Sequence, residues 1–156
     1  MRKIIGLIFF ISMNVGFSVN AAEAVVTAAA PIEIDVYRSP TCGCCGKWIK
    51  HLQENNFIVK DFVTNDVQAI KDKYGVSDNM ASCHTALVNG YVVEGHVPAA
   101  DIIKLITDKP SVIGISVPGM PVGTPGMDMG GRKDAYSVVS FDKEQNYQVV
   151  NSYEGN

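Results

Sequence analysis

Three of the four cysteines of this chain fall within four consecutive residues. Cys42, Cys44 and Cys45 come directly after a strand-like run and directly before a helix-like run, and the fourth cysteine, Cys83, is followed by His84. Any fold of this chain must therefore place its first three sulfur atoms at a junction between a strand and a helix. Four sulfur atoms in two places are the material of a soft-metal site or of a dithiol redox site.

The pattern of apolar residues predicts an α/β domain. Strands are expected over residues 32–38, 57–63, 85–88 and 91–94. Helices are expected over residues 42–55, 66–74 and 99–108. The Asn89-Gly90 pair predicts a hairpin between the last two of these strands. This order, with a Cys-x-x-Cys spacing after the first strand, predicts a thioredoxin-like layout with a central mixed sheet and flanking helices.

Helical spacing also predicts which side chains face the core. The expected inward residues are Trp48, Ile49 and Leu52 on the first helix and Ile102, Ile103 and Ile106 on the third. Met80 is expected in the core as well, because a lone methionine usually fills space there.

Two pieces lie beyond this layout. Residues 114–131 hold six glycines, three prolines and three methionines, so we expect an irregular Gly/Pro/Met-rich loop without a helix or strand. Residues 135–141 and 147–153 then predict a C-terminal hairpin.

The first residues have the pattern of an export signal. Residues 1–22 combine a basic start, a short apolar run and a small-residue exit, which predicts a secretory signal peptide and a periplasmic protein. The apolar run falls short of the roughly 18–20 residues that span a bilayer, and we expect no membrane span after cleavage. Residues 23–31 are expected to be a flexible leader, and residues 32–156 a single domain. A net charge of −3 gives no basic face for nucleic acid.

The cysteine spacing argues against two structural disulfides. Cys44 and Cys45 are neighbours, about 3.8 Å apart at Cα, and bridges within this cluster would close almost no loop. Cys42 and Cys45 have the spacing of a redox pair, but a third thiol between them would compete in exchange. A thiolate site for several metal ions gains from the extra sulfur.

The other candidate ligands are histidines and methionines. His84 follows Cys83, although it could equally be a surface or strand-end residue, and His96 could face the site or only cap the next helix. We expect His51 to face solvent. Met120 and Met127 are candidate ligands in the loop, because thioethers with thiolates favour Cu(I), whereas Zn²⁺ seldom binds methionine.

Four segments of the chain resemble the CopG-type periplasmic copper-resistance proteins, a family long described as a domain of unknown function. The similar segments cover residues 39–45, 82–86, 94–99 and 117–127. The resemblance implies a thioredoxin-like fold in which Cys42, Cys44, Cys45 and Cys83 bind copper in a thiolate-bridged cluster of more than one ion. It also implies a role in copper resistance, contacts with other periplasmic copper-resistance proteins, and a proposed interconversion of Cu(I) and Cu(II).

Two other functions remain open from the sequence. The chain could be a thiol–disulfide oxidoreductase that uses the Cys42/Cys45 pair, although Met80 to Cys83 stand where such enzymes place a proline before the third strand. It could instead be an interaction module stabilised by one zinc ion.

Overall fold

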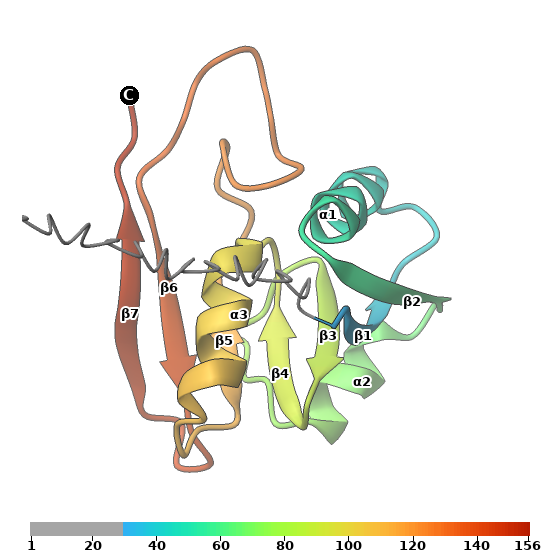
Figure 1. Cartoon of the computed structure of the whole chain (residues 1–156), viewed down its shortest axis with the longest axis vertical. Coiled ribbons are helices and arrows are strands. Elements are labelled where there is room, and N and C mark those ends of the chain that lie inside the picture. Colours follow the sequence, from blue (N-terminus) through green and yellow to red (C-terminus); the bar gives the residue numbers. More distant parts are fainter. Residues whose placement is uncertain (1–29) are drawn as a thin grey trace, which may run out of the picture.

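The computed structural model describes residues 30–156, so the predicted signal peptide over residues 1–22 and most of the predicted leader over residues 23–31 lie outside the described residues. The described chain alternates strands and helices, as Figure 1 shows. Its strands are β1 (Ile32–Arg38), β2 (Phe57–Val63), β3 (His84–Val88), β4 (Tyr91–Glu94), β5 (Gly114–Ser116), β6 (Tyr136–Phe141) and β7 (Tyr147–Tyr153). Its helices are α1 (Gly43–Glu54), α2 (Val67–Lys73) and α3 (Ala99–Asp108). No helix between residues 30 and 156 is long and apolar enough to cross a membrane.

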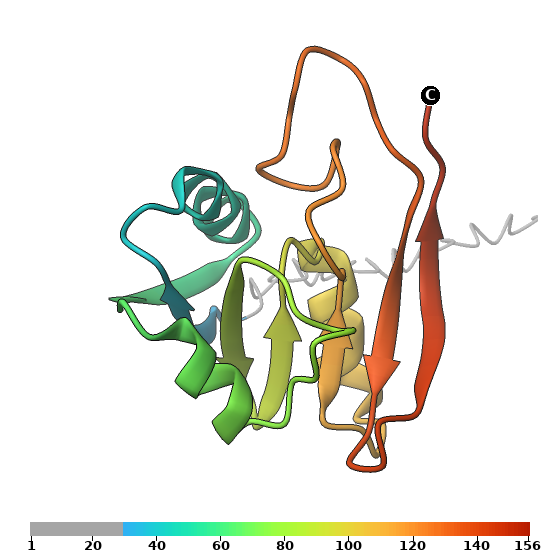
Figure 2. The same cartoon turned by 180° about the vertical axis from the view of Figure 1, so that it is seen from behind.

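The strands form one mixed sheet in the order β2-β1-β3-β4-β5-β6-β7. β1 and β2 are parallel because α1 crosses over between them, while β3 runs antiparallel to β1 and to β4. The order β2-β1-β3-β4, with α1 and α2 in the connections, is the predicted thioredoxin-like layout, which is therefore confirmed. The last three strands extend this sheet beyond β4, as the view from behind in Figure 2 shows.

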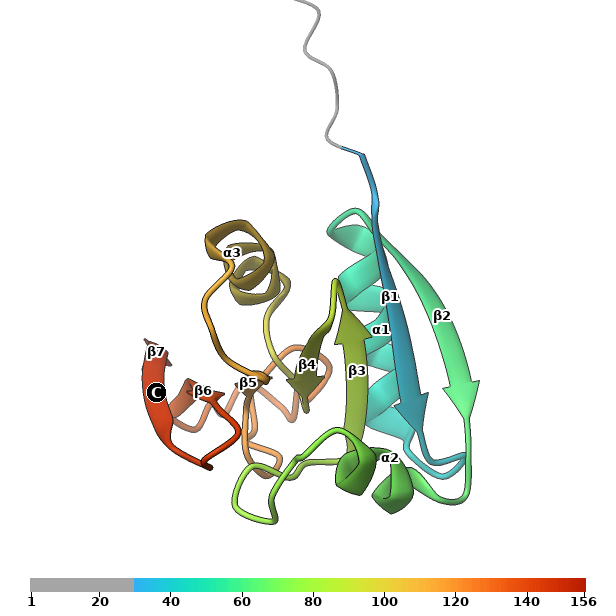
Figure 3. The same cartoon turned by 90° about the horizontal axis from the view of Figure 1, so that it is seen from below.

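Helices cover both faces of the thioredoxin-like half of the sheet. α1 and α3 lie on one face and α2 lies on the other (Figure 3). The larger core lies under α1 and α3, and it buries Trp48, Ile49 and Leu52 as predicted. A smaller core on the α2 face contains Met80, also as predicted, together with Phe141. Burial of this apolar surface, at roughly 25 cal/mol per Å², stabilises the layered arrangement.

Two predicted details of the strands and of the buried helix faces are wrong. We expected no strand within residues 114–131, but β5 forms at the start of this range, between β4 and β6. Gly114 makes this pairing possible, because a Cβ at that position would overlap a carbonyl group of β4. Ile103 is exposed rather than inward. The side chains of α3 that face the core are those of Ile102 and Leu105, one helical turn apart.

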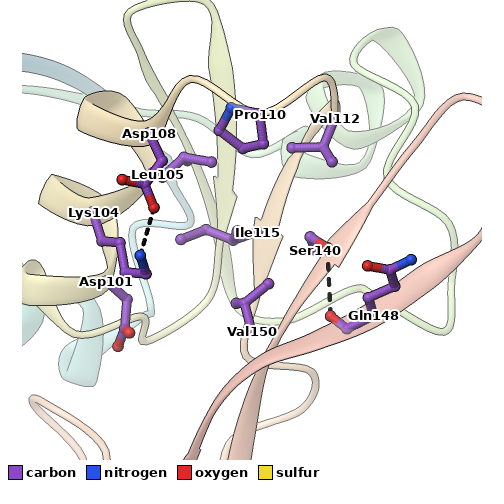
Figure 4. A pocket seen from close by; sticks show the side chains of 10 residues that line it. All are labelled: Asp101, Lys104, Leu105, Asp108, Pro110, Val112, Ile115, Ser140, Gln148 and Val150. Carbon is purple, nitrogen blue, oxygen red and sulfur yellow. Dashed lines mark hydrogen bonds and ion pairs between the residues drawn. The ribbon is translucent and has the colours of Figure 1, made fainter.

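The C-terminal hairpin of β6 and β7 forms as predicted and borders a pocket of about 220 Å³ with α3. Figure 4 shows Leu105, Ile115 and Val150 around this pocket, with the ion pair of Lys104 and Asp108 at its edge. No cysteine or histidine lines it. The pocket is therefore separate from the residues that carry the chemistry of the chain.

Candidate metal centre

The start of α1 presents three cysteines beside the end of β1. Cys42 is the N-cap residue of α1, and Cys44 and Cys45 lie in its first turn. Pro40 stops β1 just before them, since proline has no N–H to donate to a sheet. No side chain caps the helix, so the positive end of the α1 dipole is left facing this cluster, where it favours negative charge.

Four sulfur atoms converge at this point. Cys42 and Cys45 form a disulfide, with their Cα atoms 5.5 Å apart. Cys44 Sγ lies 3.5 Å from Cys42 Sγ, and Cys83 Sγ lies 3.7 Å from Cys45 Sγ. All four sulfur atoms lie within 4.8 Å of one another. The sheet therefore brings Cys83, at the entry to β3, beside the three cysteines of α1.

Cys83 belongs to a second group as well, with His84 and His96. Its Sγ lies 3.3 Å from His84 Nδ1 and 3.1 Å from His96 Nε2. His96 Nδ1 lies 2.7 Å from the carbonyl oxygen of Pro125, which can only accept a hydrogen bond. Nδ1 therefore carries the proton, and Nε2 turns its lone pair toward Cys83. A cation bound to these three residues would share Cys83 with the four-sulfur group.

His84 is fully buried, which excludes the alternative of a surface histidine. Its ring lies 4.2 Å from the Trp48 ring and 5.0 Å from the His96 ring, measured between centroids. The indole of Trp48 is itself fixed, because its Nε1 donates to the carbonyl oxygen of Val97 at 2.8 Å. Packing therefore sets the direction in which His84 presents Nδ1 to Cys83.

Burial keeps these groups in their neutral forms. It raises the pKa of the Cys83 thiol to about 12, and nearby Cys44 adds to the shift. It lowers the pKa of His84 well below its usual range, with further lowering from His96 and Lys71, and it lowers the pKa of His96 as well. Neutral imidazole is the form that binds metals, and a bound cation would compensate the charge of a Cys83 thiolate.

The loop between β5 and β6 packs on the start of α1. At Gly126, where φ is +86°, an added Cβ would lie 2.7 Å from the backbone nitrogen of Trp48 and 3.0 Å from the backbone oxygen of Cys44. The preceding residue, Pro125, is the one that holds His96. Figure 1 shows this loop in orange, extending from β5 toward α1 before it returns to β6. The loop therefore forms a cover on one side of the sulfur atoms.

The loop methionines differ in their surroundings. Met127 follows Gly126 and is half-buried, whereas Met120 and Met129 have exposed fractions of 55% and 64%. Of the two methionines predicted as candidate ligands, Met127 is thus the one whose neighbour in the chain touches α1. Met120 lies in the exposed part of the loop.

The expectation that His51 faces solvent is wrong. Its ring is half-buried, and its Nε2 accepts a hydrogen bond from the Ala99 N–H at 3.1 Å. Burial lowers the pKa of His51, which favours the neutral ring that can accept this bond. His51 thus caps α3, the role that the sequence offered for His96, and His96 is left to face Cys83.

A buried ion pair between Lys71 and Glu94 lies beside the site and was not predicted from the sequence. Two signals could have revealed it. Lys71 stands four residues after Val67, on the inward side of a short helix, and Glu94 ends a strand in the middle of the sheet. A charged residue at such a position needs a buried partner.

Two solved structures are similar to this chain over almost their whole length. Both are described as copper resistance protein CopG, in form 2 and form 1. Form 2 has 50% sequence identity and a TM-score of 0.76, and the match covers 79% of this chain and 98% of that chain. Form 1 has 51% identity and a TM-score of 0.76, covering 80% of this chain and 99% of that chain. This chain belongs to the CopG family of copper resistance proteins.

Membership of the CopG family confirms the resemblance drawn from the four sequence segments. A family model described as "protein of unknown function, DUF411" also matches residues 80–127. That range holds Cys83, His84 and His96 together with residues 117–127 of the covering loop, while the cysteines at the start of α1 precede it. No curated protein matches the chain. The family and the Cys/His cluster together support a role related to copper.

Proposed function

We propose that this CopG-family protein binds copper in the periplasm and holds Cu(I) in a cluster of thiolates. The proposed sulfur ligands are Cys42, Cys44, Cys45 and Cys83. The observation that carries the proposal is the convergence of these four sulfur atoms within 4.8 Å from two segments distant in sequence. Thiolates are soft ligands that favour Cu(I).

Charge balance favours more than one copper ion. Four thiolates around a single Cu(I) would leave a net charge of −3 in a site where Cys45 is fully buried and Cys83 is largely shielded from solvent. Unbalanced buried charge is costly, and each additional Cu(I) removes one unit of it. Bridging thiolates allow several ions to share the same four sulfur atoms.

His96 and His84 are the proposed nitrogen ligands. Each ring turns one nitrogen toward the Cys83 sulfur: His96 Nε2 lies 3.1 Å from Sγ, and His84 Nδ1 lies 3.3 Å from it. The hydrogen bond from His96 Nδ1 to the Pro125 carbonyl oxygen fixes the orientation of the ring, as such bonds do for histidines that bind metals. Met127 is the proposed loop ligand, and Met120 would join only if the loop moved inward.

The disulfide between Cys42 and Cys45 suggests that the site also undergoes redox change. In this state two of the four sulfur atoms cannot act as thiolates. Two Cu(II) ions could each accept one electron from the Cys42/Cys45 dithiol, which would yield two Cu(I) ions, this disulfide and two protons released to solvent. In the reverse reaction two Cu(I) ions would reduce the disulfide. The Cys42/Cys45 pair could therefore couple the oxidation state of copper to the oxidation state of the two sulfur atoms.

The proposed location follows from residues 1–22, whose pattern is that of a secretory signal peptide. An oxidising periplasm is a place where the Cys42–Cys45 disulfide could persist. The proposed partners are copper ions and other periplasmic copper-resistance proteins that deliver or accept them.

The test is the copper content of protein that has been reduced and loaded with Cu(I) under anaerobic conditions. We expect more than one copper per chain, and a fall to one or none in Cys83→Ser, because Cys83 joins both ligand groups. His51→Gln is the matched control, since His51 lies outside both groups and should not alter copper content. A wild-type protein that takes up one copper or less, or a Cys83→Ser variant with full copper content, would overturn the cluster.

A second candidate function is thiol–disulfide exchange. The disulfide at the start of α1 favours it, since this is where such enzymes carry their redox pair. Against it, Cys83 stands directly before β3 in contact distance of Cys45 and would compete in exchange. Insulin reduction that is abolished by Cys42→Ser and unchanged by Cys83→Ser would favour the enzyme.

The zinc-stabilised interaction module is the remaining alternative. A single tightly held zinc ion, with unfolding when the zinc is removed by a chelator, would favour it.

A further inference from the structure

A buried polar network lies beneath the segment that carries Cys83. Glu94, at the end of β4, is fully buried, and its Oε1 accepts a hydrogen bond from the Ser82 N–H at 2.6 Å. Its Oε2 accepts a hydrogen bond from the Thr85 hydroxyl at 2.7 Å. Lys71, from α2, forms an ion pair with Glu94 and donates to Thr85 Oγ1 at 3.0 Å. Each charged group of the network therefore has a partner.

The opposite side of this segment is held by the covering loop. The Ser82 hydroxyl donates to the carbonyl oxygen of Gly119, whose own N–H donates to the Ala81 oxygen at 3.1 Å. Gly95 has a φ of +74°, and a Cβ there would lie 2.6 Å from Ser82 Cβ. Ser82 is thus clamped between the Glu94 carboxylate below and the loop above.

The clamp acts on Cys83 through the backbone. Ser82 precedes Cys83, and His84 follows it as the first residue of β3, where its carbonyl oxygen accepts the Gly95 N–H at 3.0 Å. We propose that the Glu94 carboxylate, held in place by Lys71, is a positioning group that fixes Cys83 in the sulfur site. The use of this position for copper rests on the proposed function, whereas the positioning itself does not.

If Glu94 positions Cys83, the residue at position 94 must offer an oxygen to the Ser82 N–H. An ion pair that serves only stability can often be replaced by apolar residues of similar size with little loss. A positioning carboxylate cannot, because the Ser82 N–H would lose its acceptor and the segment would be released. Lys71→Met with Glu94→Gln removes both charges but keeps an oxygen for Ser82. Lys71→Met with Glu94→Leu removes the charges and the acceptor together.

The position of Cys83 can be measured without any metal. In a Cys42→Ser/Cys44→Ser background, Cys45 and Cys83 are the two remaining thiols, with sulfur atoms 3.7 Å apart. Reaction with glutathione disulfide converts these two thiols into one intramolecular disulfide and releases two molecules of glutathione, so atoms and electrons balance. The equilibrium constant reports the effective concentration of one thiol at the other.

We expect the double substitution Lys71→Met/Glu94→Leu to lower this constant by about tenfold or more, because misplacement by about an ångström strongly reduces effective concentration. The double substitution Lys71→Met/Glu94→Gln should keep the equilibrium constant within about threefold of that of the parent, because glutamine still offers an oxygen to the Ser82 N–H. Val138→Ala, in the core of β6, is the control for lost stability and should leave the constant unchanged.

A second perturbation keeps the test decisive if the leucine variant does not fold. Gly95→Ala pushes directly on Ser82 and leaves Lys71 and Glu94 in place, and it should lower the glutathione constant as well. Equal constants for the glutamine and leucine variants, or an unchanged constant in folded Gly95→Ala, would overturn the positioning role. Cu(I) loading of the same variants with all four cysteines present separates the two ideas: a changed glutathione constant with no copper bound by any variant, wild type included, would refute the copper site alone.

Discussion

Replacing Gly126 with alanine tests whether the loop between β5 and β6 is held against α1. The φ of +86° makes alanine unfavourable there by about 1–2 kcal/mol. The new Cβ would also lie 2.7 Å from the Trp48 nitrogen and 3.0 Å from the Cys44 oxygen, and these backbone atoms cannot yield without moving α1. The loop must lift instead, which breaks the hydrogen bond of His96 to Pro125, worth about 0.5–1.5 kcal/mol.

Gly130→Ala is the matched control, because Gly130 lies in the same loop with a φ of +67° and has no atom within 4 Å of the added Cβ. It carries the backbone strain alone, about 1–2 kcal/mol. Adding the hydrogen bond to the strain, we expect Gly126→Ala to lower the free energy of unfolding by about 1.5–3.5 kcal/mol. The difference between the two variants measures the contact of the loop with α1.

The assay is urea unfolding followed by the fluorescence of Trp48, which is the one tryptophan of the chain and is fully buried. The free energy of unfolding comes from linear extrapolation to zero urea, and an unchanged slope shows that the transition remains comparable. If both alanine variants lost the same free energy, the loop would not be packed on α1. In that case the argument that the loop covers the sulfur atoms would fail.

Further predictions concern the packing around the site and the C-terminal hairpin. Trp48→Phe leaves the Val97 carbonyl oxygen without its donor and should lower the free energy of unfolding by about 1–3 kcal/mol. Because this variant has no tryptophan, its urea unfolding is followed by circular dichroism, and a smaller loss would show that water replaces the indole. Tyr153→Phe removes the hydroxyl that donates to Asp101 at 2.6 Å and should cost about 1 kcal/mol, more than Tyr136→Phe, whose ring only stacks on Tyr153. Burial raises the pKa of Tyr136 to about 12. Below pH 10 the tyrosine holds its proton in both the folded and the unfolded protein, so its contribution to the free energy of unfolding is complete, and this contribution is lost as the pH rises toward 12. Absorbance titration of the tyrosines, with Tyr136→Phe for assignment, checks this, and ionisation near pH 10 would contradict it.

The thioredoxin-like half of the fold was predictable because its signals are local. Apolar periodicity defined the strands and helices, and Asn89-Gly90 defined the hairpin between β3 and β4. β5 was not predictable in this way. Its three residues carry almost no periodic signal, and it forms because Gly114 can approach β4 closely, which depends on a partner distant in sequence.

The candidate site was predictable in its sulfur atoms and less so in its surroundings. Cysteine is rare enough that four residues in two motifs point to one place, whereas a histidine serves many roles. His51 and His96 show the difference. His51 lies in the last turn of α1 and His96 stands just before α3, and only the tertiary contacts decide that His51 caps α3 and His96 faces Cys83. The Lys71–Glu94 pair joins two elements, so local spacing could indicate that Lys71 needs a buried partner but not that this partner is Glu94.

The loop that covers the sulfur atoms begins and ends on the sheet, at β5 and β6, whose pairing joins Ser116 to Val139. Its ends are therefore set by a register that does not depend on the residues between them. Beyond Met127 such a loop can be lengthened or shortened while Gly119 keeps its contact with Ser82 and Pro125 keeps its contact with His96, much as antibody loops vary on a constant frame. The side chain at a loop position such as the half-buried Met127 can thus change, during evolution or by grafting, without any change in the cysteines.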